Sequence, residues 1–144
     1  WDSYHVNTWS TIGDSGNPNM FTPCIEYWTG DGEKLADKVM TATVAGLTPN
    51  GKYSVSILAC PAVNTGENGV APTGIELQVG EGTPVSLCTG ARIAETRFYE
   101  GTFTAEGTAD AEGNLVIKIN VAATNASWLS FRNVKYEKLP EVAT

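Results

Sequence analysis

The amino-acid sequence predicts an all-β protein, an antiparallel β-sandwich of about nine short strands. Three observations lead to this prediction. Apolar side chains alternate with polar ones over short stretches, which is the period of a half-buried strand. Turn-forming residues cluster between those stretches at regular spacing, as they do between the strands of a sandwich. Fifteen glycines and seven prolines in 144 residues also favour short strands over helices.

The clearest strand lies near the carboxyl terminus of the chain. Every second residue from Leu115 to Val121 is a leucine, isoleucine or valine, and the intervening residues are mostly polar. This alternation predicts one face on a core and one face in water. The turn formers at 109–114 predict a hairpin that joins this strand to the preceding run at 102–105.

The last strand-like run contains a shift in its alternation. Leu129 and Phe131 share one parity, whereas Val134 and Tyr136 take the other. One extra residue at 132–133, a β-bulge, would let both pairs face the core. We expect that arrangement because burying an apolar side chain of this size is worth about 1.5–3 kcal/mol.

The order of the strands indicates how the loops are distributed. The other strands are expected at 4–10, 24–28, 39–45, 52–60, 75–79, 85–87 and 97–104. Several connections are longer than two residues, which suits strands that cross between two sheets and favours a jelly roll. If each strand reverses the last, one end of the sandwich collects the loops at 10–23, 46–51, 80–83 and 105–113. The other end collects those at 29–38, 61–73, 89–96 and 122–126.

Length and charge limit the classes of function. The chain predicts one domain over 1–136, followed by a carboxyl-terminal tail or linker at 137–144. Because the chain begins with Trp1, we expect a processed product or an excised domain. A net charge of −7 argues against binding to nucleic acid or to an anionic membrane surface. No apolar run approaches the roughly 20 residues that a membrane span requires, so membrane insertion is not expected.

The three cysteines do not form a recognisable motif. Cys24, Cys60 and Cys88 include no C-x-x-C pair, and the single histidine, His5, cannot complete a usual zinc site. We expect three free thiols. If a disulfide forms, strand direction favours Cys60 with Cys88, because both residues end strands at the same end of the sandwich.

Four segments resemble a known group of domains. They read L-A-D-K (35–38), M-T-A-T-V-A-G-L-T-P-N-G-K-Y (40–53), G-T-F-T-A (101–105) and W-L-S-F-R-N-V-K (128–135). Together they resemble galactose-binding-like jelly-roll modules, similar to carbohydrate-binding modules, in secreted and surface proteins of gut anaerobic bacteria. The resemblance runs from about Trp9 to Tyr136. It implies a jelly-roll fold, an extracytoplasmic location and attachment to a larger secreted or cell-surface protein.

The resemblance also implies a non-catalytic binding module whose partner is a glycan. Such modules place flat aromatic rings against the apolar faces of sugars and reach the hydroxyl groups with amides, carboxylates or arginine. Trp9 and Trp28 each end a strand and open onto a loop, whereas Trp128 opens a core strand and is expected to pack in the sheet. The candidate carbohydrate-binding residues are Trp9, Trp28, Asp31, Asn64, Asn68 and Arg92.

The sequence also bears on calcium binding, on catalysis and on a spacer role. Modules of this group often hold a structural calcium ion, for which oxygen donors exist at Asp14, Asn17, Glu26 and Asp31, although no EF-hand loop is present. An enzyme is not expected, since there is no G-x-S-x-G, P-loop or Rossmann motif. The alternative to glycan binding is a spacer module that contacts neighbouring domains of the parent protein and binds no small molecule.

Overall fold

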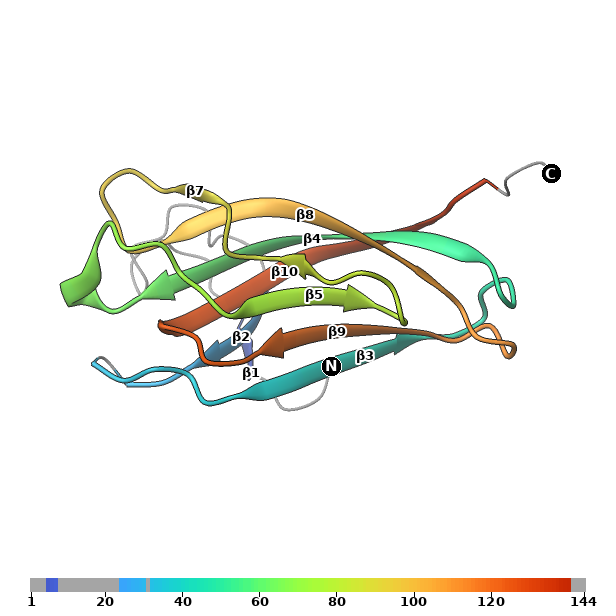
Figure 1. The fold of residues 1–144 in the computed structure, drawn as a ribbon, viewed down its shortest axis with the longest axis horizontal. Coiled ribbons are helices and arrows are strands. Elements are labelled where there is room, and N and C mark those ends of the chain that lie inside the picture. Colours follow the sequence, from blue (N-terminus) through green and yellow to red (C-terminus); the bar gives the residue numbers. More distant parts are fainter. Residues whose placement is uncertain (1–4, 8–23, 31, 141–144) are drawn as a thin grey trace.

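The chain forms a sandwich of two antiparallel sheets in a computed structural model (Figure 1). The structure describes residues 5–7, 24–30 and 32–140. One sheet has six strands in the order β1-β2-β10-β4-β8-β7, and the other has four in the order β3-β9-β5-β6. The predicted fold class is confirmed. Within the described ranges, no helix has the length and apolar character that a membrane span requires.

The described part of the chain contains ten strands and one 3-10 turn. Their bounds are β1 (His5–Asn7), β2 (Cys24–Trp28), β3 (Lys38–Val44), β4 (Lys52–Val63), η1 (Thr65–Glu67), β5 (Ile75–Val79), β6 (Val85–Ser86), β7 (Ala91–Arg92), β8 (Tyr99–Thr108), β9 (Leu115–Val121) and β10 (Ala126–Lys138).

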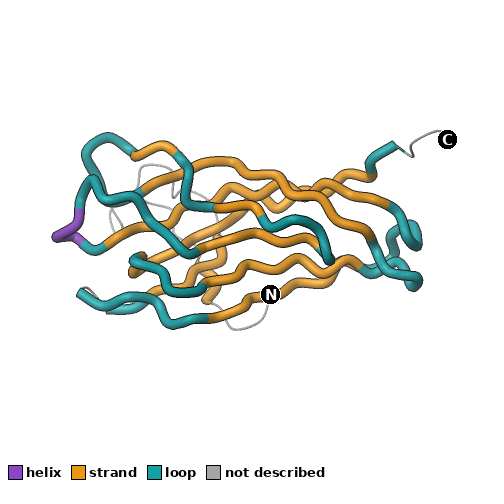
Figure 2. The backbone as a smooth tube through the Cα atoms, in the orientation of Figure 1, coloured by secondary structure: helices purple, strands orange, loops and turns teal. Residues whose placement is uncertain are grey.

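Most strands overlap the predicted ranges, although β4 continues to Val63 and β8 continues to Thr108, beyond the expected ends at 60 and 104. The strands β2, β5 and β9 have the expected bounds, and β7 is a short addition within a stretch that was expected to be a connector. The strand β10 continues to Lys138, and the Leu139 N–H then donates to the Lys52 carbonyl at 2.8 Å. Loops gather at both ends of the sandwich (Figure 2). Those after β2, β4, β7 and β9 share one end, at the left of Figure 1, as predicted.

The predicted hairpin between β8 and β9 is wrong. The strand β8 pairs with β4, whereas β9 pairs with β3 and β5, so their connection crosses from one sheet to the other. The Asp110 carboxylate closes this connection locally by accepting the N–H groups of Glu112 and Asn114 at 3.0 and 2.9 Å. The Leu47 N–H then donates to the Gly113 carbonyl at 3.0 Å, which ties the connection to the β3–β4 loop. Crossing the sandwich lets both strands turn an apolar face toward one core.

The main core lies between the two sheets. Residues of β9 alternate between buried and half-buried along its whole length, which confirms the predicted face from Leu115 to Val121. The inward residues of β4, β5 and β10 complete this core, with Val55, Leu77 and Phe131 among the fully buried side chains.

A second apolar cluster lies on the outer face of the six-stranded sheet, the face turned away from β9. It consists of Cys60, Ala62, Phe98 and Trp128, with Ile93 packed against it. Because neighbouring residues of a strand point to opposite faces, this stretch of sheet is buried on both sides.

The predicted β-bulge in β10 is confirmed. The pairing of β10 with β4 shifts between Arg132 and Lys135, and Asn133 takes a positive φ of 55°. The shift places Tyr136 opposite the core residue Val55, but Val134 and Tyr136 are 36% and 51% exposed, so the expectation that the core buries them is wrong. The strand β2 pairs with β10 only over 128–131, so within the described ranges nothing flanks the far half of β10 on that side.

The two sides of the bulge therefore predict different responses to mutation. We expect Phe131→Ala to lower the free energy of unfolding by about 3–5 kcal/mol, because it empties a fully buried site. Val134→Ala should change it by less than about 0.5 kcal/mol, as at other exposed positions. Urea denaturation of both variants measures the difference, and equal losses would show that Val134 is packed in solution.

The two cysteines whose side chains the structure describes lie in different parts of the fold. Cys60 is buried in the outer cluster, whereas Cys88 is half-buried against the main core, so the two do not pair. The side chain of Cys24 lies outside the described residues. Burial raises the pKa of the Cys88 thiol above its ordinary value.

A raised pKa predicts slow alkylation of Cys88. In the folded protein at neutral pH, we expect iodoacetamide to modify Cys88 more slowly than in the urea-unfolded chain, because less thiolate is present. The rate for Cys88 should keep rising with pH where an ordinary cysteine, with a pKa of about 8.5, has levelled off. Peptide mass spectrometry resolves each cysteine. Equal rates in the folded and unfolded chains would contradict this prediction.

Candidate functional site

The predicted tryptophan platform Trp28 lies at the loop end of the six-stranded sheet. It is the last residue of β2, and its side chain is 53% exposed. Trp28 is paired across the strands with Trp128 of β10, so the two residues share the outer face. The chain then leaves the sheet into the β2–β3 loop, starting with a hydrogen bond of 2.9 Å from the Thr29 N–H to the Ser127 carbonyl.

Trp28, Trp128 and Phe98 form a row of aromatic residues across β2, β10 and the start of β8, which we name the outer aromatic row. The rings of Phe98 and Trp128 meet edge to face, with centroids 5.3 Å apart and planes at 89°. The Arg97 guanidinium stands 4.8 Å from the centre of the Phe98 ring and donates to the Val63 carbonyl at 2.9 Å. Phe98 and Trp128 are therefore held in place, and Trp28 is the exposed member of the row.

A buried carboxylate supports the middle of the row. The Trp128 indole N–H donates to Glu26 Oε2 at 2.7 Å, and Glu26 is only 5% exposed. On the same face, Arg132 of β10 lies 3.8 Å from the Glu100 carboxylate of β8, and both side chains are largely buried. Buried charges require partners, and these groups have them. The outer face is thus polar next to the aromatic row.

Asn64, a predicted carbohydrate contact, joins two loops instead. Its Oδ1 accepts the Gly32 N–H at 2.8 Å, and its Nδ2 donates to the Glu33 carbonyl at 2.9 Å. The residue is 7% exposed. The amide therefore holds the β2–β3 loop against the end of β4, and both of its polar ends already have protein partners.

The predicted partners Asn68 and Arg92 lie together but apart from Trp28. Asn68 is exposed directly after η1, and the Arg92 guanidinium stands 3.5 Å from where a Cβ atom on the adjacent Gly69 would be. Arg92 Nε also donates to the Thr96 carbonyl at 2.7 Å. Arg92 belongs to β7 and Trp28 to β2, and β10, β4 and β8 separate these strands. Trp9 and Asp31 lie outside the described residues.

Arg97 and Phe98 were not among the predicted site residues. The sequence shows only an arginine followed by an aromatic residue at the start of a strand, and nothing local indicates that this ring meets Trp128. Another polar group of the β2–β3 loop, also not among the predicted site residues, is Glu33. Its carboxylate accepts the Thr29 hydroxyl at 2.8 Å on the exposed side of the β2–β3 loop.

A calcium site finds no support among the described residues. Of the four oxygen donors named above, only Glu26 is described, and it holds the Trp128 indole. Within the described ranges, no group of three or more histidine, cysteine, aspartate or glutamate side chains is arranged to hold a metal ion. The donor set on these ranges does not fit the six to eight oxygens that calcium takes.

The double hydrogen bond of Asn64 predicts a structural role that can be measured. We expect Asn64→Ala to lower the free energy of unfolding by about 1–3 kcal/mol, because it leaves two backbone groups without their partner. Asn68→Ala, the matched change at an exposed asparagine four residues away, should cost less than about 0.5 kcal/mol. Chemical denaturation of both variants tests this. If the two variants lose the same stability, the two hydrogen bonds of Asn64 do not stabilise the fold.

Comparison with solved structures finds a similar fold in a sugar-binding protein, the EclA C-terminal domain. The two share 15% sequence identity and superimpose with a TM-score of 0.53 over 94% of this chain and 84% of that one. At this identity the likeness concerns the fold alone. The enzymatically active domain of tailspike protein 4 from bacteriophage CBA120 gives a TM-score of 0.48 at 16% identity. That match covers 94% of this chain but only 18% of the tailspike chain. No family model and no curated protein matches the sequence.

Proposed function

We propose that this protein is a non-catalytic carbohydrate-binding module, carried by a larger secreted or cell-surface protein, with Trp28 as the platform for a sugar ring. The observation that carries the proposal is the exposure of Trp28, 53%, at the end of β2 where the sheet opens onto loops. An indole ring offers a flat apolar face that matches the C–H face of a pyranose.

The surroundings of Trp28 favour binding because the neighbouring residues are rigid. Trp128, its cross-strand neighbour, is fixed by the hydrogen bond to Glu26 and by edge contact with Phe98. A platform supported in this way loses little conformational freedom when a ligand arrives, which improves affinity.

Hydroxyl-binding groups follow Trp28 in the β2–β3 loop. Thr29 follows Trp28 directly, and its hydroxyl donates to the exposed Glu33 carboxylate. A carboxylate can accept several hydrogen bonds, so Glu33 can also take a sugar hydroxyl. The similar fold of the sugar-binding EclA domain is compatible with this proposal.

The alternative is a spacer module that contacts a neighbouring domain. Val134 and Tyr136 favour it, because two large exposed apolar side chains lie close together near the end of β10. This alternative predicts that Val134 and Tyr136 matter for the parent protein and that Trp28 does not.

Replacement of Trp28 separates the two functions. We expect the wild-type chain to bind members of a glycan array, and Trp28→Ala to weaken the strongest of these interactions about tenfold or more in calorimetric titration. Tyr136→Ala removes an aromatic ring of similar exposure and should leave the affinity unchanged. Unfolding of each variant by urea serves as the folding control.

Two results would contradict the proposal. One is the absence of binding across a broad panel of plant and host glycans. The other is equal weakening by Trp28→Ala and Tyr136→Ala, which would show that the indole has no specific role.

A further inference from the structure

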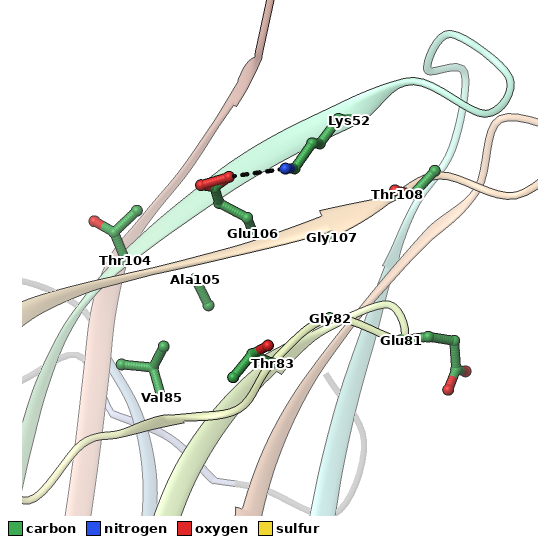
Figure 3. A pocket seen from close by; sticks show the side chains of 10 residues that line it. All are labelled: Lys52, Glu81, Gly82, Thr83, Val85, Thr104, Ala105, Glu106, Gly107 and Thr108. Carbon is green, nitrogen blue, oxygen red and sulfur yellow. Dashed lines mark ion pairs between the residues drawn. The ribbon is translucent and has the colours of Figure 1, made fainter. Parts of the chain in front are cut away.

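A cleft of about 570 Å³ lies on the flank of the sandwich, between β8 and the turn that joins β5 to β6 (Figure 3). Thr83 and Val85 line it from the turn and β6, and Thr104, Ala105 and Glu106 line it from β8. In Figure 3, Ala105 points toward Thr83 and Val85, while Thr104 and Glu106 project from the other face of β8. The cleft is separated from Trp28 along the sheet, because β10 and β4 lie between β2 and β8.

One wall of the cleft is a strand edge. The strand β8 pairs with β4 over 101–108, but on its other side β7 pairs only with Tyr99 and Glu100. The Ile93 N–H donates to the Phe98 carbonyl on the β7 side, and the Ala109 N–H donates to the Gly51 carbonyl on the β4 side. Because backbone groups alternate sides along a strand, the N–H and C=O of Thr102 and Thr104 are directed toward the free edge.

Two glycines close this edge at both ends. A Cβ atom on Gly82 would lie 1.9 Å from the Glu106 carbonyl oxygen, so the β5–β6 turn sits directly against β8 there. A Cβ atom on Gly90 would lie 2.7 Å from the Glu100 carbonyl oxygen. Between these contacts, the edge offers the backbone groups of two residues. This length of free edge is too short for a docked strand, because a docked strand forms many successive backbone hydrogen bonds. The edge is long enough for a small ligand.

The side chains around the cleft indicate the chemistry of that ligand. The threonine hydroxyls of 83, 104 and 108 both donate and accept hydrogen bonds. Glu106 is paired with Lys52 at 3.4 Å, and Glu81 is the other charged residue of the lining, so the cleft carries no more than one net negative charge. Val85 and Ala105 add an apolar surface for C–H groups. A neutral ligand with many hydroxyl groups matches this combination of hydroxyls, strand-edge backbone and small apolar area.

We infer that the cleft between β8 and the β5–β6 turn is a second ligand site, which takes a neutral polyhydroxylated molecule such as a short saccharide. Its volume falls within the range of small-molecule sites, about 300–1,000 Å³. The inference rests on the cleft itself and does not depend on Trp28. A module with sites on two edges of one sheet would contact a glycan chain at two points.

Nuclear magnetic resonance tests the inference residue by residue. The ¹⁵N-labelled chain is titrated separately with the neutral disaccharides maltose, cellobiose and lactose. We expect at least one of them to cause saturable shifts of the backbone amides of Thr104, Gly82 and Gly107. Thr104→Val should weaken this binding about fivefold to tenfold, because it removes one hydroxyl with little change in shape. Thr43→Val, at an exposed threonine of β3 outside the cleft lining, should leave it unchanged.

Trp28→Ala distinguishes this inference from the proposed function. Cleft shifts that persist in Trp28→Ala support a separate site, whether or not glycans bind at Trp28. Shifts confined to the Trp28 indole with all three sugars would overturn the inference and leave the proposed function standing. The inference would also fail if no sugar shifts the cleft amides, or if Thr104→Val and Thr43→Val bind equally.

Discussion

The pairing of β10 with β4 is the interaction on which the rest of the structure depends. On the inner face it brings Leu129 and Phe131 into the main core, and on the outer face it places Trp128 in the second cluster. The six-stranded sheet is therefore buried on both sides where these two strands meet. Because β2 pairs with the same segment of β10, the position of Trp28 follows from this pairing. The pairing of β10 with its neighbours therefore determines both the core and the position of the candidate site.

Much of the fold was predictable because apolar and polar side chains alternate along its strands. A shift of one residue in the pairing of a strand would place its apolar side chains in water. The alternation does not indicate which strands pair with each other. The 109–114 segment has the residues of a hairpin turn, yet β8 and β9 belong to different sheets. Likewise, the parity of Val134 predicted the bulge correctly, but parity does not indicate whether another element covers that part of β10, and Val134 is exposed.

The candidate site was predictable only in part, and for a related reason. Trp28 was identified by its place at the end of a strand, which is a local property of the sequence. Asn64 resembled a ligand-binding amide, but its partners lie on a loop more than thirty residues earlier in the chain. The contact between Phe98 and Trp128 joins two strands that both flank β4 in the sheet. Contacts between side chains that are far apart in the chain cannot be predicted from the local pattern of one sequence.

The two glycine contacts along β8 also bear on how this protein behaves at high concentration. An uncovered strand edge is a template on which other chains can add strands, and such growth leads to aggregation. Gly82 and Gly90 bring neighbouring backbone so close to Glu106 and Glu100 that an incoming strand meets obstruction at both ends. A larger residue at either position would displace that covering backbone and lengthen the accessible edge. The close backbone approach at these two glycines therefore limits the length of edge on which another chain could add a strand.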